Sequence, residues 1–177
     1  MNLAGFYEES ISNGIGWRAV IFVSGCPHNC EGCQNREAQD PNYGEEFTVN
    51  KQLEIFEQIR NNTKYRNGIV TGVTLSGGEP FCSAQELFPL VKGLRALGLN
   101  IWAYSGYTIE ELESLDIKGA KELLSLVDVL VDGRFVKRLN RPDLVFRGSS
   151  NQRIIDLKKY RQGLALEECL IVDEEEF

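Results

Sequence analysis

Short apolar runs that alternate with helical patterns constrain the fold of this 177-residue chain more than any other feature. Four such runs end in glycine or a polar residue, as buried parallel strands do. They cover residues 18–25, 72–76, 100–105 and 127–132. Strands that are separated by helices are joined by right-handed crossovers, so we expect them to share one parallel sheet. The sequence therefore predicts an α/β fold.

Helical patterns fill the segments between these runs. The predicted helices cover residues 49–61, 83–97, the turn that follows Thr108, and 121–126. Ser83, with Glu86 three residues later, predicts a capping box at the start of its helix. Thr108 and Glu111 repeat this pattern.

Unusual residues follow each predicted strand at the same end. The four strand ends carry the cysteine loop of residues 26–33, the motif Ser76-Gly77-Gly78-Glu79, the triplet Ser105-Gly106-Tyr107 and the triplet Asp132-Gly133-Arg134. In parallel α/β folds the ligand binds where strands reach their carboxyl ends. Glycines with a purely structural role would have no reason to recur at one end of successive strands. The sequence therefore predicts a single pocket at this edge.

The cysteine loop has the spacing C-x-x-x-C-x-x-C, formed by Cys26, Cys30 and Cys33. Three soft thiolates on one short loop suit an iron–sulfur cluster. They are one too few to close a metal site, which leaves one metal position open for a ligand. Structural zinc is the alternative, with a fourth ligand from elsewhere. His28 lies inside the loop, so we expect it at the surface or beside the ligands rather than on the metal. The remaining two thiols, expected to be incidental or buried in the core, are Cys82 and Cys169.

Two of the other strand ends also suggest binding roles. Gly77 and Gly78 would let a ligand approach the main chain closely, and Glu79 would receive a positively charged group. A tight turn between strand and helix is the alternative explanation. Asp132 and Arg134 straddle a glycine, and their opposite charges would suit a zwitterion. The alternative for this pair is a surface ion pair.

Composition and charge exclude several classes of function. With 42% hydrophobic residues the chain can bury a core as one domain over residues 1–177, with residues 165–177 expected to form a frayed acidic tail. No stretch approaches a membrane span, and the first residues do not resemble a secretory signal. Five cysteines, three of them clustered, favour metal ligation in a reducing cytoplasm over disulfides. A net charge of -7 and a pI near 4.9 disfavour nucleic-acid binding.

A basic segment interrupts this acidic chain. Residues 134–161 contain nine Lys or Arg and two acidic residues, Asp143 and Asp156, so the segment carries +7 and the remainder -14. The segment would suit an acidic partner. A solvated surface without a partner explains the same charges equally well.

Together these motifs resemble the radical S-adenosylmethionine enzymes that activate anaerobic ribonucleoside-triphosphate reductase. The resemblance covers nearly the whole chain. It implies a partial, open (β/α) barrel with a parallel sheet, truncated relative to a complete barrel. Its motifs are residues 13–18 (NGIGWR), 22–26 (FVSGC), the cysteine loop, 76–80 (SGGEP), 131–135 (VDGRF) and 147–153 (RGSSNQR). The last of these narrows the match to the reductase activators, and its chemical role does not follow from the sequence.

The resemblance implies a [4Fe-4S] cluster with three irons held by the cysteine loop and the fourth chelated by S-adenosylmethionine. One electron would cleave the sulfonium, and the 5'-deoxyadenosyl radical would abstract hydrogen from a glycine of the reductase to leave a glycyl radical. The cluster and cosubstrate carry this chemistry, so no catalytic side chain is expected. The implied cofactor-binding residues are Gly32, Cys33, Gln34, Ser76, Gly77, Gly78, Glu79, Ser105, Asp132 and Arg134.

The implied partners are the anaerobic reductase and an electron donor such as a flavodoxin-type protein. Lys137, Arg138 and Arg141 would dock one of them. Two other functions fit the same sequence. One is the activation of a formate-lyase type glycyl-radical enzyme. The other is a non-catalytic binding module that zinc stabilises.

Overall fold

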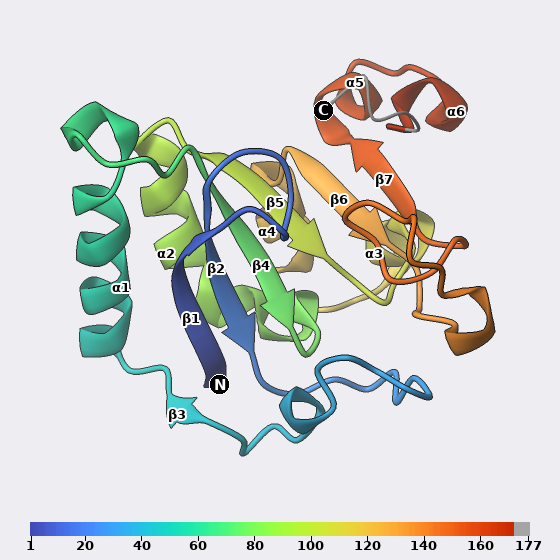
Figure 1. Ribbon diagram of the computed structural model, residues 1–177, viewed down its shortest axis with the longest axis horizontal. Helices are drawn as coiled ribbons and strands as arrows, with labels where there is room; N and C mark the ends of the chain where they lie inside the picture. Colours follow the sequence, from blue (N-terminus) through green and yellow to red (C-terminus); the bar gives the residue numbers. More distant parts are fainter. Residues whose placement is uncertain (172–177) are drawn as a thin grey trace.

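The computed structural model describes residues 1–171 and contains one mixed sheet flanked by helices (Figure 1). The strands are β1 (Asn2–Ser10), β2 (Arg18–Val23), β3 (Glu45–Glu46), β4 (Gly72–Gly77), β5 (Asn100–Tyr104), β6 (Val129–Asp132) and β7 (Arg153–Asp156). Their order in the sheet is β3-β1-β2-β4-β5-β6-β7. The neighbours β2, β4, β5 and β6 pair in parallel and correspond to the four apolar runs of the sequence.

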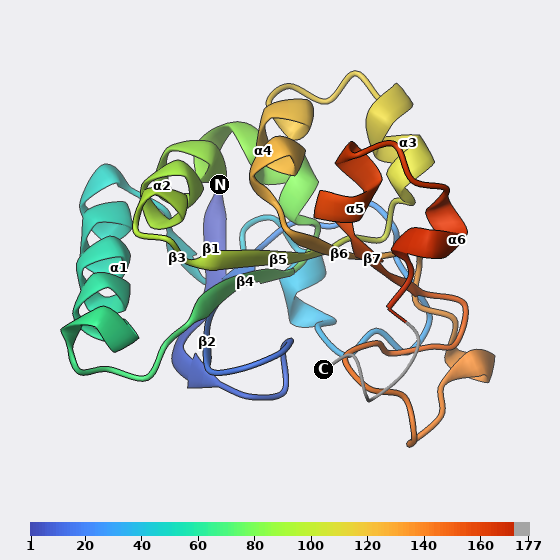
Figure 2. The same cartoon turned by 90° about the horizontal axis from the view of Figure 1, so that it is seen from above.

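The helices lie mainly on one face of this sheet, as the view from above shows (Figure 2). They are α1 (Val49–Asn61), α2 (Ala84–Ala96), α3 (Ile109–Ser114), α4 (Ala120–Leu126), α5 (Leu157–Arg161) and α6 (Leu166–Cys169), with short 3-10 turns η1 (Glu37–Gln39), η2 (Lys64–Arg66), η3 (Pro80–Ser83) and η4 (Lys137–Leu139). The predicted helix over residues 49–61 is confirmed to the residue. Within the described part of the chain, no helix has the length and hydropathy to cross a bilayer.

Both faces of the sheet are apolar, because the central strands are buried from both sides. Along β5, Ile101 and Ala103 join the main core under the helices. Trp102 points to the opposite face, since side chains alternate along a strand. There it belongs to a smaller cluster with Val129, Val131 and Ile154. Loops rather than helices cover this second face (Figure 2).

The four predicted strands pair in parallel as expected, but three further strands that were not predicted make the sheet mixed. β1 pairs antiparallel with β2, β3 antiparallel with β1, and β7 antiparallel with β6. A parallel pair needs a long crossover that returns the chain to the same end of the sheet. The connection over residues 11–17 is too short for this, and residues 133–152 stay at the carboxyl end of β6, where Asn151 and Gln152 donate to Arg134 O and Gly133 O. Both connections therefore produce antiparallel pairs.

The expected frayed tail is also corrected over the part that the structure describes. Residues 166–169 form α6, and Cys169 is completely buried in the main core. The backbone of Leu170 then forms a bridge with Ile155 of β7. Residues 172–177, which include most of the acidic run, lie outside the described residues.

The NGIGWR motif closes the amino-terminal ends of the parallel strands. Arg18 is 1% exposed, and its guanidinium donates to Thr74 Oγ1 at 2.7 Å and lies 5.2 Å from the centre of the Trp102 ring. It also donates to the carbonyl oxygens of Ile15, Val73 and Asn100. Burial lowers the pKa of Arg18 to about 10. Gly14 has a φ of +124°, and a Cβ there would lie 2.8 Å from Trp102, so the close approach requires glycine. Arg18 and Gly14 of this motif therefore have structural roles.

One predicted capping box forms and the other does not. The Glu111 N–H donates to Thr108 Oγ1, and the Thr108 N–H donates to the Glu111 carboxylate at 2.8 Å. Ser83 makes no capping hydrogen bond with its side chain, and Glu86 instead lies 3.5 Å from the amino terminus of Met1. Ser83 ends the turn η3 with a ψ of 20°, whereas a capping serine needs an extended backbone.

This difference predicts unequal stability losses. We expect Thr108→Ala to lower the free energy of unfolding by about 1 kcal/mol, because it leaves the Glu111 N–H without its capping oxygen. Ser83→Ala, the matched control, should cost less than about 0.5 kcal/mol, because no cap is lost. Urea denaturation of the two variants measures both values. Equal losses would contradict the assignment of the caps.

Candidate iron–sulfur and cofactor site

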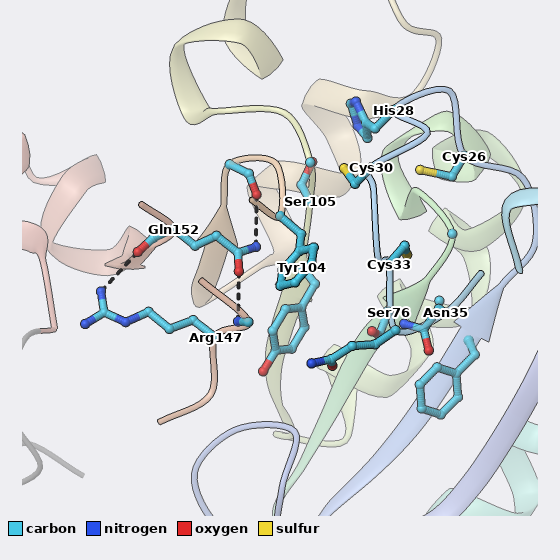
Figure 3. Close-up of a pocket in the computed structure, with 18 of the residues that line it drawn as sticks. Cys26, His28, Cys30, Cys33, Asn35, Ser76, Tyr104, Ser105, Arg147 and Gln152 are labelled. Carbon is cyan, nitrogen blue, oxygen red and sulfur yellow. Dashed lines mark hydrogen bonds between the residues drawn. The ribbon is translucent and has the colours of Figure 1, made fainter. Parts of the chain in front are cut away.

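A pocket of about 360 Å³ opens at the carboxyl ends of the parallel strands (Figure 3). All four strand ends reach it, as the positions of the motifs predicted. The predicted site residues that line it are Cys26, Cys30, Cys33, Gln34, Ser76, Gly77, Gly78 and Ser105. Its volume lies in the range of sites for small molecules and cofactors.

The cysteine loop forms one wall of the pocket, and its three thiols are half-buried (Figure 3). The start of the loop is held by the turn η1, because Gly25 N–H donates to Ala38 O and Cys26 N–H donates to Gln39 O. Gly32 adopts a left-handed φ of +73°, which lets the loop reverse before the third cysteine. Burial raises the pKa of the Cys26 thiol to about 11. A bound metal would offset this burial by stabilising the thiolate.

The donor set fits a cluster better than a single ion. Within residues 1–171, no three His, Cys, Asp or Glu side chains are grouped closely enough to hold one metal ion. Four thiolate positions of a [4Fe-4S] cluster are distributed over separate irons, so cluster ligands need not converge on a single point. The three thiols of this loop face a common pocket without converging in that way. They therefore suit three corners of a cluster.

The end of β4 presents bare backbone to the same pocket. Gly77 has a φ of +97°, and a Cβ there would lie 2.5 Å from backbone atoms of Val23. A Cβ at Gly78 would lie 2.4 Å from the carbonyl oxygen of Gly25. The Gly78 N–H also donates to Val23 O at 2.7 Å. Glycine is thus required by the packing of β4 against the end of β2, and the resulting absence of side chains opens the pocket beside Ser76.

The structure places Glu79 away from the pocket. Its carboxylate is completely buried and its two oxygens accept hydrogen bonds from protein groups. A positively charged ligand in the pocket would find this carboxylate already engaged. The expected contact between Glu79 and a ligand is therefore not present in this arrangement.

Asp132 and Arg134 do not form the expected zwitterion-binding pair. Asp132 is completely buried, accepts from the Ile109 N–H at 2.8 Å and pairs with Arg153 at 2.6 Å. Arg134 is exposed on the other side of Gly133. β6 ends at Asp132 and Gly133 turns the chain with a left-handed φ of +96°, so the spacing of the two charges did not bring them together. Neither residue, nor Gly32, lines the pocket among the described residues, whereas Gly133 does.

The RGSSNQR element, residues 147–153, braces the backbone that follows β6. The Gln152 side chain donates to Gly133 O at 2.9 Å, and its oxygen accepts from the N–H groups of Gly148 and Ser149 (Figure 3). Further bracing bonds join Asn151 to Arg134 O, Val136 N–H to Ser149 Oγ and Arg147 to Gln152 O. Every one of these bonds involves a backbone group. The element therefore shapes one wall of the pocket.

Several pocket residues were not predicted as site residues. They are Ser12, Asn13, Phe22, His28, Asn35, Gln39, Tyr104, Gly106, Gly133, Phe135, Leu144, Phe146, Arg147, Gly148 and Gln152. Phe146 has an unusual φ of +53°, and its carbonyl oxygen accepts from the buried Tyr104 hydroxyl at 2.8 Å. Burial raises the pKa of Tyr104, so it stays protonated as a donor. Many of these positions lie within the strand-end motifs or the motifs at residues 13–18 and 147–153. No motif covers the others, which are Ser12, Asn35, Gln39, Tyr104, Leu144 and Phe146.

Comparisons with known proteins agree with this site. A family model described as a 4Fe-4S single cluster domain matches residues 12–155, which include all three clustered cysteines. The chain is 37% identical over 162 residues to the anaerobic ribonucleoside-triphosphate reductase-activating protein of Escherichia coli strain K12, covering 89% of this chain and 100% of that protein. It is 36% identical to the protein of that name from Salmonella typhi, with 86% and 97% covered, and 35% identical to that of Enterobacteria phage T4, with 87% and 93% covered. The chain therefore belongs to the family of anaerobic ribonucleoside-triphosphate reductase-activating proteins.

Proposed function

We propose that this chain activates an anaerobic ribonucleoside-triphosphate reductase by forming a glycyl radical in it. With a [4Fe-4S] cluster and S-adenosylmethionine bound, one-electron reduction would cleave the sulfonium, and the 5'-deoxyadenosyl radical would take a hydrogen atom from a glycine of the reductase. The cytoplasm is the proposed location, because its reducing conditions keep the cysteines as thiols.

One observation carries this proposal. Three thiols, and no other cysteine of the described residues, line a pocket that Ser76 and the bare backbone of Gly77 and Gly78 also line. The thiols would hold three irons, and the bare backbone would receive the amino acid part of S-adenosylmethionine. Both parts meet in a chain that belongs to a family of reductase-activating proteins.

The side chains that could fill the fourth cluster position are engaged or distant. The Sγ atom of Cys82 lies 4.0 Å from the Tyr107 hydroxyl, and Cys82 is not among the pocket residues. Cys169 is buried in the core, with its thiol directed at Ala165 O. His28 Nε2 is bonded to Glu79. These contacts support a fourth iron that has no protein ligand and that S-adenosylmethionine would chelate.

The remaining pocket residues would orient the cosubstrate and exclude water. Aromatic and aliphatic side chains form one part of the wall: Phe22, Tyr104, Phe135, Leu144 and Phe146. An apolar wall keeps bulk water out of the site. Side-chain amides and hydroxyls supply the polar part, from Ser12, Asn13, Gln34, Asn35 and Gln39. The protein thus needs no acid or base of its own.

We also propose that the parallel strands β2, β4, β5 and β6 are the counterpart of part of a (β/α) barrel. Their consecutive order and the ligand pocket at their carboxyl ends support this interpretation. The antiparallel strands β1 and β7 flank them on either side. Such a truncated barrel would leave a side open through which a glycine-bearing loop of the reductase can reach the pocket.

Anaerobic incubation with the reductase, S-adenosylmethionine and a reductant tests the function. Electron paramagnetic resonance should then show a glycine-centred doublet in the reductase. A doublet that appears only with a formate-lyase type partner would reassign the chain to that second class of activase. A colourless protein that binds zinc and leaves S-adenosylmethionine intact would instead support the binding module.

Basic residues beside the cysteine loop would dock the reductase or a flavodoxin-type electron donor. Lys137 Nζ lies 3.0 Å from Glu31 of the loop, and Arg141 lies 3.0 Å from Asp143. All four side chains are more than half exposed, so these ion pairs contribute little and can be exchanged for a partner's carboxylates. Arg138 is exposed between them.

Reversal of charge at Lys137, Arg138 and Arg141 tests the docking. Replacing all three by glutamate should lower the initial rate of glycyl-radical formation about tenfold at low salt, with a smaller difference at high salt. The matched control reverses three exposed lysines on the helical face, Lys92, Lys118 and Lys121, which changes the net charge equally. Equal effects of the two triple variants would contradict a specific docking surface.

A further inference from the structure

A buried histidine connects the cysteine loop to the ends of two strands. The His28 side chain is 3% exposed although it belongs to a loop, and it lies on the chain between Cys26 and Cys30 (Figure 3). Its Nε2 atom is 2.9 Å from Glu79 Oε2, at the end of β4. Its ring packs edge-on against Tyr107, which follows β5, with ring centres 4.4 Å apart. No other side chain of the described residues 26–33 makes both kinds of contact.

The Glu79 carboxylate is organised to receive this histidine. One oxygen accepts from Ser105 Oγ at 3.0 Å and from Phe81 N–H at 3.1 Å. The other accepts from Gly106 N–H at 2.8 Å and from His28. A carboxylate can only accept, so His28 Nε2 carries the proton of the shared bond. A carboxylate with four donors and no exposure is rigidly held, so it fixes the ring that it binds.

Gly106 gives an independent indication that the imidazole has a defined place. A Cβ at Gly106 would lie 2.2 Å from His28 Cδ2 and 2.5 Å from His28 Nε2. The φ of Gly106 is not positive, so its backbone does not need glycine for conformational reasons. The space taken by the imidazole is therefore what excludes a side chain at this position.

We propose that His28 is a positioning residue that clamps the cysteine loop to the ends of β4 and β5. The Glu79 carboxylate then acts on the site through His28 instead of contacting the cosubstrate. The clamp would hold the thiols of Cys26 and Cys30 toward the pocket before any cluster is present. This inference rests on the proposed function only in assigning the loop to a cluster.

Hydrogen exchange in the cluster-free protein tests the clamp without any activity. His28→Ala should raise the exchange rates of backbone amides in residues 26–33 about tenfold, because a buried bond to a charged group is lost. Gly106→Ala should have a similar effect on the same peptide, although it removes no polar group, because its methyl displaces the imidazole. Gly5→Ala is the matched control, since a Cβ there meets its nearest atom at 3.9 Å. It should leave the loop unchanged.

Iron release gives a second readout on the reconstituted protein. We expect a chelator to remove iron about tenfold faster from His28→Ala and Gly106→Ala than from the wild type. His28→Gln, which keeps a donor at similar reach, should restore at least half of the lost protection. Far-ultraviolet circular dichroism verifies that each variant is folded. If His28→Ala fails to fold, the loop protection and iron release of Gly106→Ala and His28→Gln test the clamp instead.

Three results would overturn the clamp. They are a wild-type loop that already exchanges at the unprotected rate, variant loops that exchange as the wild type does, and protection lost equally throughout the chain. A wild-type protein that is protected as expected but forms no glycyl radical would leave the clamp intact and refute the proposed function. Failure of the clamp and failure of the proposed function therefore give different results.

Discussion

Replacing Cys30 by alanine should remove the brown colour of the anaerobically reconstituted protein and lower glycyl-radical formation more than about 100-fold. The expected loss is larger than that for a residue that only orients a ligand, which is about 10 to 100-fold. Cys30 is the middle cysteine of the loop, and its thiol lines the pocket with those of Cys26 and Cys33. Iron analysis, visible absorbance and electron paramagnetic resonance of the same sample measure the effect.

Cys82→Ala is the matched control for this experiment. Cys82 follows the SGGEP motif closely in sequence, but it is exposed and does not line the pocket among the described residues. We expect it to keep the full iron content and activity. A Cys30→Ala protein that retains its iron, or a Cys82→Ala protein that loses it, would show that the cluster has a different ligand set.

Asp132→Ala should lower the free energy of unfolding by about 3–5 kcal/mol, the cost of removing one partner of a buried ion pair. Asp132 has no exposed surface, and its loss would leave the Arg153 guanidinium and the Ile109 N–H without their shared acceptor. The second partner of Arg153, Glu110, is more than half exposed and compensates only in part. Urea denaturation of the cluster-free protein measures this loss.

The exposed pair of Asp143 and Arg141 provides the control. Asp143→Ala removes an ion pair of similar length, 3.0 Å, but from the surface, so it should cost less than about 1 kcal/mol. Asp132→Asn keeps the shape of the side chain and one acceptor. Its decrease in the free energy of unfolding should therefore lie between those of Asp132→Ala and Asp143→Ala. If Asp132→Ala is as stable as Asp143→Ala but no longer binds S-adenosylmethionine, Asp132 is a ligand residue and its structural assignment is wrong.

Local pattern predicted the elements whose neighbours are also close in sequence. The helix over residues 49–61 and the capping box at Thr108 were confirmed because spacing and capping depend on interactions over three or four residues. Strand β1 was missed, since its residues are mostly half-exposed or exposed and show no clear alternation. Strand β7 was missed because only two apolar residues, Ile154 and Ile155, lie between charged ones. Their antiparallel direction depends on connections, not on their own residues.

The candidate site shows the same limit at the level of side chains. Thiol spacing and glycine content placed the cysteine loop and residues 76–78 at one edge of the sheet, where the structure brings them together. Charge alone was a poorer guide, because a carboxylate near a pocket is more stable when protein donors satisfy it than when it is left for a ligand. Glu79 and Asp132 both turned inward for that reason.

The sequence by itself determined the cysteine spacing, the parallel pairing of four strands and the end of the sheet at which the motifs gather. These properties follow from residue type and chain connectivity, which do not depend on distant contacts. Only the tertiary structure decided that Glu79 binds His28, that Asp132 binds Arg153 and that the RGSSNQR element braces the backbone after β6. These pairs are 51, 21 and 19 residues apart, and burial selects such partners only when the strands have assembled.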